Sequence, residues 1–273
     1  MVTLSETDGP LNAASGRNAG FKLLREKHPD VAFVQFIDGD CIIESGWVST
    51  ARDVLERNPR VAVVCGRRRE AFKEHSFYNR LADEEWNTPI GEAPACGGDA
   101  LMRVAALEEV GLFDAGLRAG EEPELCFRLR QRGWKIWRID APMTVHDMAM
   151  TTLGQWMRRA RRSGQGYAQA FARTRGGAQP LYRRQLISAM LWAVGIPAAA
   201  ILMAIIVRQP LVLLTAPALY AAQIARMASR RGIGALASWH YGALMLGSKF
   251  AEALGALDVW SAPSERNLGG KSA

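Results

Sequence analysis

The sequence predicts an α/β domain followed by helices that are apolar enough to cross a membrane. Short apolar runs alternate with helical spacing in the first half of the chain, which is typical of a sheet flanked by helices. Residues 1–147 contain 24 acidic and 19 basic residues, whereas residues 148–251 contain 13 basic residues and no acidic residue. Within this basic part, residues 186–207 carry no charge. With 49% hydrophobic and 22% charged residues, the composition excludes a disordered or collagenous chain.

The first half predicts its elements in a clear order. A helix is expected to begin with Ser15 as its N-cap and to run to Leu24, before Pro29. A buried strand over residues 31–37 and a second strand over residues 61–65 are joined by a helix over residues 47–55, so the two strands should be parallel. The later elements are a strand over 100–103, a helical turn over 105–110, a helix over 123–132 and a strand over 134–139.

Uncharged runs in the second half predict a membrane hairpin. Residues 186–207 are long enough to cross a hydrocarbon core as a helix, and residues 209–225 form a second run after a reversal at 208–210. Arginines stand at both outer ends of the hairpin, which places these ends in the cytoplasm. A weaker third run over residues 232–248 is either interfacial or a third span. The alternative is a buried helical hairpin in a soluble protein.

These features divide the chain into four segments. We expect an α/β domain over residues 1–150, a basic juxtamembrane helical segment over 151–185, the hairpin with its third helix over 186–250, and a polar tail over 251–273. No signal-peptide pattern opens the chain. The expected location is therefore the cell membrane, with the α/β domain facing the cytoplasm.

Four cysteines are spread over the first domain. Cys41, Cys65, Cys96 and Cys126 lie 24 to 31 residues apart, without the paired spacing of a zinc site. We interpret them as reduced, structural thiols.

Two carboxylates follow the first buried strand. Asp38 and Asp40 flank Gly39, and ligands of open α/β sheets bind where strands end. Carboxylate oxygens suit Mg²⁺ or Mn²⁺, which in turn bind phosphate oxygens. The alternative is a strand-ending turn rich in Asp and Gly.

Together with further motifs, this pair resembles the inverting family 2 glycosyltransferases of the GT-A type. Members of that family transfer a sugar from a nucleotide-diphosphate donor. The resemblance covers about residues 13–147 and has the motifs in the family's order. They are residues 16–20 with Arg17 and Asn18, Asp38 and Asp40, Gly97 and Gly98 with Arg103, residues 110–114, Glu121 and Glu122, and residues 128–133.

The resemblance implies a role for each matching residue. Glu122 matches the general base, with Glu121 beside it as a second candidate, and the N-terminus of a helix there should favour the ionised carboxylate. Asp38, Asp40 and His146 match a site for Mg²⁺ or Mn²⁺. A capping acid is the alternative for Glu122, and a structural imidazole is the alternative for His146. Residues implied in donor binding are Arg17, Asn18, Asp38, Gly98, Asp99, Arg158 and Arg162.

The implied partners are a nucleotide-sugar donor, a polysaccharide or lipid-linked acceptor and the membrane, with no nucleic acid. Arg158 and Arg162 follow Gln155 in a partial match to a motif of processive members. Their guanidinium groups suit a leaving diphosphate, and they equally suit an anionic lipid surface.

Two departures from the family stand out. Members open with an apolar strand containing Pro and Asn and a second strand with Asp, and neither precedes Arg17. We therefore expect a catalytic domain that lacks its first nucleotide-binding strands. The alternatives to a truncated N-terminus are a mis-assigned start and a second chain that supplies these strands. Glu122 is also one methylene longer than the usual Asp. The alternatives to an enzyme of this family are an inactive remnant acting as a membrane interaction protein, and a soluble metal-dependent nucleotidyl- or phosphotransferase.

Overall fold

The computed structural model describes residues 11–261, which form two compact units. Of these residues, the first unit comprises 11–156 and 172–181, and the second comprises 157–171 and 182–261. Residues 1–10 lie outside the described residues, as does most of the predicted polar tail. The expected truncation therefore stays a prediction.

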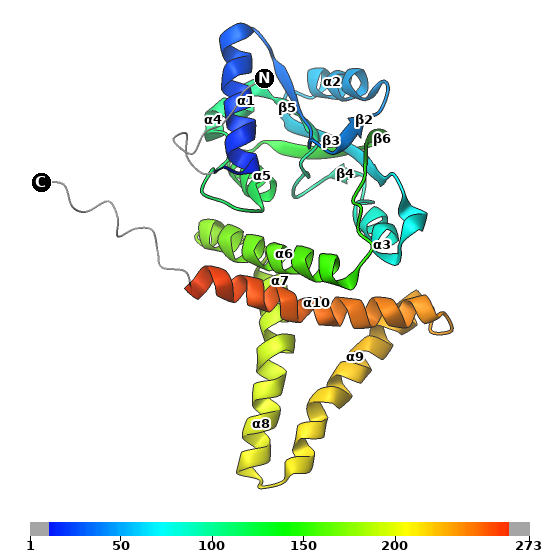
Figure 1. Cartoon of the computed structure of the whole chain (residues 1–273). Coiled ribbons are helices and arrows are strands. Elements are labelled where there is room, and N and C mark those ends of the chain that lie inside the picture. The colour runs from blue at the N-terminus through cyan, green and yellow to red at the C-terminus, as the bar shows by residue number, and fades with distance from the viewer. Residues whose placement is uncertain (1–10, 262–273) are drawn as a thin grey trace, which may run out of the picture. The chain divides into compact units, whose positions relative to one another are not determined.

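A six-stranded sheet forms the centre of the first unit (Figure 1). Its order is β1-β5-β3-β6-β2, and the short β4 pairs with β6. Among the described pairs, β3 and β6 are parallel and the others are antiparallel. The predicted sheet flanked by helices is therefore confirmed, and the sheet is mixed. The strands are β1 (Phe33–Phe36), β2 (Cys41–Ile43), β3 (Val61–Glu70), β4 (Gly91–Glu92), β5 (Ala100–Arg103) and β6 (Lys135–His146).

The first two predicted strands run in the same direction, as expected, but they are not neighbours. Both β1 and β3 are antiparallel to β5, which lies between them. Pattern alone could not show this, because an isolated apolar run does not identify its partner. The sequence did not predict β2. It also predicted β6 too short, since this strand continues seven residues beyond Ile139 to His146.

Helices flank this sheet, and four of them lie close to predicted positions. These are α1 (Ala13–Lys27), α2 (Trp47–Arg57), α4 (Val104–Val110) and α5 (Glu121–Gln131). The sequence did not predict α3 (Phe77–Glu85) or the short 3₁₀ turn η2 (Lys73–His75). The expected cap at Ser15 is wrong. Asn12 caps α1 instead, because its side chain accepts a bond from the Ser15 amide at 2.9 Å. Helix α5 begins at Glu121 rather than Pro123, directly after Gly120 in the left-handed conformation with φ 84°.

Close packing of α2 on β3 depends on one glycine. A Cβ atom at Gly66 would lie 2.6 Å from both the Trp47 ring and the Ala141 carbonyl oxygen. Trp47 is buried at 1% exposure, and its indole N–H donates to the Gln35 side chain at 2.8 Å. The absence of a side chain at Gly66 therefore lets the largest residue of α2 reach the sheet.

The second unit is helical in its described residues. Its elements are the middle of α6 (Leu153–Thr174), α7 (Arg183–Met190), the π-helical turn η3 (Leu191–Gly195), α8 (Ile196–Ile206), η4 (Pro210–Leu214), α9 (Thr215–Arg231) and α10 (Leu236–Ser261). Figure 1 shows α8 and α9 joined end to end at η4 as a hairpin. Arg208 at the reversal has a positive φ of 51°.

Two stretches of this unit are long and apolar enough to cross a membrane. They are Arg183–Ile206 and Pro210–Arg231, and 11% and 17% of their most apolar windows are buried. A hairpin packed in the core of a soluble protein would be mostly buried, so the exposure favours the predicted hairpin over that alternative. The third apolar run differs from expectation. Helix α10 continues through the start of the predicted tail to Ser261, and Ala253 and Ala256 are buried.

Helices α6 and α10 approach each other through two glycines. A Cβ atom at Gly164 would overlap the backbone of Glu252, and one at Gly255 would overlap the backbone of Arg161. Arg161 also pairs with Asp258 at 2.7 Å across the same contact. The small residues therefore set the separation of these two helices.

We predict that Gly255→Ala destabilises the second unit by about 1–3 kcal/mol, because the added methyl group must displace backbone atoms of α6. Thermal unfolding of the full chain in detergent measures the effect. Gly247→Ala on the same helix is the control, since its Cβ would meet only the end of the flexible Met157 side chain. Equal stability of the two variants would contradict close glycine packing.

Candidate active site and metal centre

The end of β1 and the start of β5 bring two carboxylates together. Phe36 pairs with Ala100 in the antiparallel register, so the residues just beyond them, Asp38 and Asp99, meet at the same edge. The Asp38 amide donates to Asp99 Oδ1 at 2.9 Å. Asp99 is fully buried, whereas the Asp38 side chain is 31% exposed. Sheet pairing thus places a buried acid behind a partly exposed one.

Arg68, from β3, binds both of these carboxylates. Its Nη2 lies 2.8 Å from Asp38 Oδ2, and its Nε donates to Asp99 Oδ2 at 2.9 Å. The Thr144 hydroxyl donates to the same Asp99 oxygen at 2.6 Å. Burial opposes ionisation of Asp99, but the charge of Arg68 and the Thr144 bond outweigh it and lower the pKa of that carboxyl. Sequence reasoning missed Arg68, although three consecutive arginines at the end of a strand were a signal.

Arg17, from α1, gathers the remaining acids. One guanidinium nitrogen donates to Asp38 Oδ1 at 2.7 Å and lies 3.0 Å from Glu122 Oε1, while the other donates to Glu121 Oε1 at 2.7 Å. The group also lies over the Phe113 ring, 5.5 Å from its centroid. The structure therefore brings together Arg17, Asp38 and both predicted acids of α5.

The pKa of Glu122 shifts in the direction opposite to expectation. Burial, reinforced by the neighbouring charge of Glu121, raises the pKa of Glu122 to about 7, although Arg17 opposes the shift. The first turn of α5 does hold this acid, as predicted, but the helix N-terminus does not keep its pKa low. A carboxylate with a pKa near 7 can accept a proton at neutral pH.

Gly98 leaves space for one of these acids, and Asn18 binds the backbone near the others. A Cβ atom at Gly98 would overlap the Asp38 carboxylate, so only glycine permits the observed approach. The Asn18 amide donates to the Phe113 carbonyl at 2.8 Å and accepts from the Phe113 amide at 3.1 Å. Asn18 therefore holds the turn before α5 in place, and its predicted part in donor binding stays a prediction.

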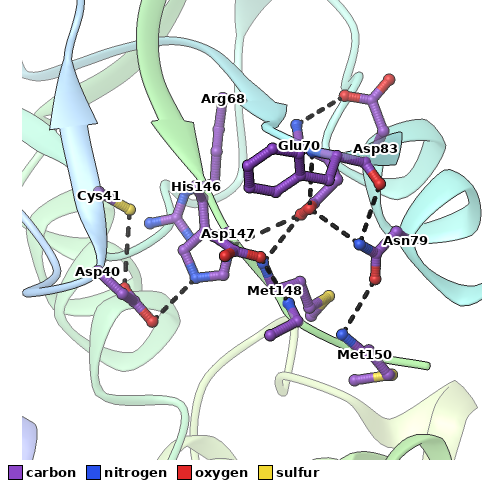
Figure 2. Close-up of polar contacts among 12 residues, drawn as sticks. Asp40, Cys41, Arg68, Glu70, Asn79, Asp83, His146, Asp147, Met148 and Met150 are labelled. Carbon is purple, nitrogen blue, oxygen red and sulfur yellow. Dashed lines mark hydrogen bonds and ion pairs between the residues drawn. The ribbon is translucent and has the colours of Figure 1, made fainter. Parts of the chain in front are cut away.

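His146 lies beside Asp40 (Figure 2). Its Nε2 is 3.1 Å from Asp40 Oδ2, and the residue is the last of β6, where it pairs with Cys41 of β2. Its Nδ1 is buried without a hydrogen-bond partner. The carboxylate of Glu70, which is fully buried, lies 4.0 Å from that nitrogen.

Glu70 is itself held from several sides, as Figure 2 shows. It accepts from the Asn79 side chain and from the Met148 amide, each at 3.1 Å. Sequence reasoning missed this residue, because Glu70 becomes buried only when β3 and α3 pack together. The network fixes the segment that follows His146.

Among residues 11–261, two groups of side chains have the geometry to hold a cation. Asp40, Cys41 and His146 form one, and Asp38, Cys41 and Asp99 form the other, with the ligand atoms of each group within 4.8 Å of one another. Carboxylate oxygen and imidazole nitrogen suit Mn²⁺, and His146 turns its Nε2 toward the Asp40 carboxylate. The donor atoms present therefore fit a divalent metal. Asp40 and His146 fall in one group and Asp38 in the other, so the predicted site of all three residues stays a prediction.

The predicted phosphate ligands Arg158 and Arg162 lie in the second unit, exposed on α6. Their role stays a prediction. Gln155 has a local function instead, because it forms a capping box with Thr152 at the start of α6.

Comparison with known proteins identifies relatives of one kind. The profile of glycosyl transferase family group 2 matches residues 33–227. Succinoglycan biosynthesis protein ExoA of Rhizobium meliloti (strain 1021) is 26% identical over 105 residues, which are 38% of this chain and 32% of ExoA. The chain thus matches about a third of that relative's length.

Two solved structures align over most of the chain. The mannosyltransferase PcManGT from Pyrobaculum calidifontis, in complex with GDP-Man and Mn²⁺, aligns with a TM-score of 0.47 and 19% identity, covering 89% of this chain and 74% of its own. TarS 1–349 of S. aureus aligns with a TM-score of 0.39 and 12% identity, covering 90% of this chain and 69% of its own.

We predict that Gly98→Ala lowers Mn²⁺ affinity by roughly 10- to 100-fold, because the methyl group displaces Asp38 from its two arginines. Isothermal titration of the full chain with Mn²⁺ measures the change. Gly97→Ala is the matched control, since a Cβ there meets no atom within 4 Å. Unchanged affinity in Gly98→Ala would mean that the position of Asp38 does not affect the metal.

Proposed function

The chain belongs to glycosyl transferase family group 2, and from this membership we propose that it transfers a sugar from a nucleotide-sugar donor to an acceptor hydroxyl with inversion. The carrying observation is the placement of Glu122, Glu121 and Asp38 on the single guanidinium of Arg17. This contact places the Glu122 carboxylate, whose pKa is about 7, beside carboxylates that can bind a cation. Acceptor activation and leaving-group stabilisation need these two elements side by side.

Glu122 is the proposed general base. It accepts the proton of the acceptor hydroxyl as that oxygen attacks the anomeric carbon. Arg17 keeps the carboxylate in place through its contact at 3.0 Å, and the pair with Glu121 occupies the other guanidinium nitrogen. Since Glu121 binds Arg17 more closely, it positions the guanidinium, and Glu122 carries the proton.

Asp38, Asp40 and His146 are the proposed holders of Mg²⁺ or Mn²⁺. Five carboxylates share this region with two guanidinium groups, which leaves a formal charge of −3 when all are ionised. A divalent cation reduces that excess, and when bound it supplies positive charge to the departing diphosphate. The carboxylates are Asp38, Asp40, Asp99, Glu121 and Glu122, and the guanidinium groups are those of Arg17 and Arg68.

A cavity beside these residues suits the sugar part of the donor. It has a volume of about 250 Å³ and is lined by Arg68, Trp86, Gly97 and Asp99 among others. Its polar groups can bind sugar hydroxyls, and the Trp86 ring offers an apolar surface to a sugar ring. ExoA is named for the biosynthesis of succinoglycan, which supports a polysaccharide or lipid-linked acceptor for this chain as well.

We predict that Glu122→Gln lowers turnover by roughly 10² to 10⁴, because the amide keeps the shape but cannot accept a proton. The assay is release of nucleoside diphosphate from a panel of nucleotide sugars, with Glu108→Gln, an exposed acid of α4, as the control.

In the parent, kcat/KM should rise with pH up to about 7 and then level off, since the base must be deprotonated and its pKa is about 7. Unchanged turnover in Glu122→Gln would favour Glu121 as the base. A parent that releases no diphosphate from any donor would favour the inactive remnant.

We also infer that residues 183–231 form a membrane hairpin with both outer ends in the cytoplasm. The two candidate spans expose most of their apolar surface, and contiguous apolar surface of this kind needs a nonpolar environment. Arg183 and Arg184 begin the hairpin and Arg230 and Arg231 end it, whereas Arg208 stands at its tip. The charge difference favours the outer ends on the cytoplasmic side.

A membrane-impermeant thiol reagent applied to intact cells tests this topology. We predict that it labels Gln209→Cys at the tip and does not label Arg230→Cys until the membrane is opened. Labelling of position 230 from outside would mean that the outer ends of the hairpin do not lie in the cytoplasm. Extraction of the protein by carbonate would rule out the integral hairpin.

A further inference from the structure

We propose that Cys41 supplies a sulfur ligand to the metal centre, so that the site of Asp40, Cys41 and His146 binds soft or borderline divalent ions such as Co²⁺, Zn²⁺ and Cd²⁺. The inference rests on the proposed function only because Asp40 and His146 belong both to this site and to the metal site proposed above. It replaces the sequence-based interpretation of Cys41 as a structural thiol.

Strand pairing fixes the relation between the thiol and the imidazole. Cys41 and His146 are direct partners in the antiparallel pair of β2 and β6. Side chains of directly opposed residues point to the same face of a sheet, with Cβ atoms roughly 4.5–5.5 Å apart. The two donors are therefore held together by backbone hydrogen bonds, and they do not depend on a flexible loop.

Asp40 completes the group from the residue before Cys41 (Figure 2). Its Oδ1 is 3.9 Å from Cys41 Sγ, its Oδ2 is 3.1 Å from His146 Nε2, and the three ligand atoms all lie within 4.8 Å of one another. Ligands of a tetrahedral ion with bonds of 2.0–2.3 Å lie about 3.5 Å apart. The observed separations lie on both sides of that value, so small side-chain rotations are enough to close the site.

The position of Cys41 differs from that of the other cysteines. Cys65, Cys96 and Cys126 are buried in the core, whereas Cys41 is only partly buried and Asp40 is 62% exposed. An ion from solvent can thus reach this group. When sulfur binds the ion, the thiol proton leaves to water and the thiolate remains as the ligand.

A sulfur ligand changes the preference of the site. Thiolate and imidazole favour Co²⁺, Zn²⁺ and Cd²⁺, whereas Mg²⁺ favours oxygen alone. Without Cys41, Asp40 and His146 would bind Mg²⁺ or Mn²⁺, because these two side chains alone discriminate little against hard ions. With Cys41, soft ions should bind more tightly and displace Mg²⁺ from this position.

Titration of the full-length protein in detergent with Co²⁺ tests the proposal, because a thiolate bound to cobalt gives a near-ultraviolet charge-transfer band. We predict this band in the parent, its absence in Cys41→Ser, and at least a tenfold weaker Cd²⁺ affinity in that variant. Cys126→Ala removes a buried thiol outside both ligand groups and should keep the band. In case Cys41→Ser unfolds, Cys41→Asp offers oxygen in place of sulfur and should bind Mn²⁺ without the band.

Absence of the band in the parent at saturating Co²⁺, or its persistence in Cys41→Ser, would overturn the proposal. The two proposals fail in different ways. A parent that shows the band but releases no nucleoside diphosphate from any donor contradicts the proposed function alone. A parent that transfers sugar but shows no band contradicts the sulfur ligand alone.

Discussion

The carboxylate of Asp38, held between Arg17 and Arg68, is the interaction on which the site depends. Its two oxygens each face a different guanidinium group, at 2.7 and 2.8 Å. Arg17 extends this contact to the start of α5, and Arg68 extends it to Asp99 at the start of β5. Removal of one partner from such a mostly buried network leaves an uncompensated charge, which is strongly destabilising. The network therefore holds α1, α5 and the sheet in one arrangement, and Gly98 leaves the space that it needs.

The order and length of the strands place the other side chains of the site beside this network. Insertion of β5 between β1 and β3 places Asp99 next to Asp38, and the length of β6 carries Thr144 and His146 to the same edge. Pairing of β2 with the end of β6 then sets Cys41 opposite His146. Acids, imidazole and thiol thus converge because strands distant in sequence share a register. Around Glu122 the same convergence removes water, which is why burial outweighs the helix N-terminus in setting its pKa.

The second unit follows a different physical rule. Where α6 and α10 meet, glycines allow backbone contact, and Ala168 and Ala256 belong to the buried core cluster of this unit. In α8 and α9, by contrast, large apolar side chains including Ile201, Leu202, Ile205 and Leu219 remain exposed. The contact between α6 and α10 thus comes from close approach of small residues, while the hairpin leaves its large apolar side chains exposed, as the proposed membrane spans require.

Periodicity and composition in the sequence determined the α/β class, most helices, the apolar hairpin and the order of the acidic motifs, because these depend on neighbours along the chain. Strand order, the long β6 and the Asn12 cap needed the structure, since pairing and capping depend on which groups fold against each other. The sequence also identified Asp38, Asp40, Glu122 and His146 as candidates. It could not show that Arg68 and Glu70 stand beside them, or that Cys41 faces His146. Those relations arise only when β2, β3 and β6 come together, because electrostatics and ligand geometry depend on distance in space and not on separation in sequence.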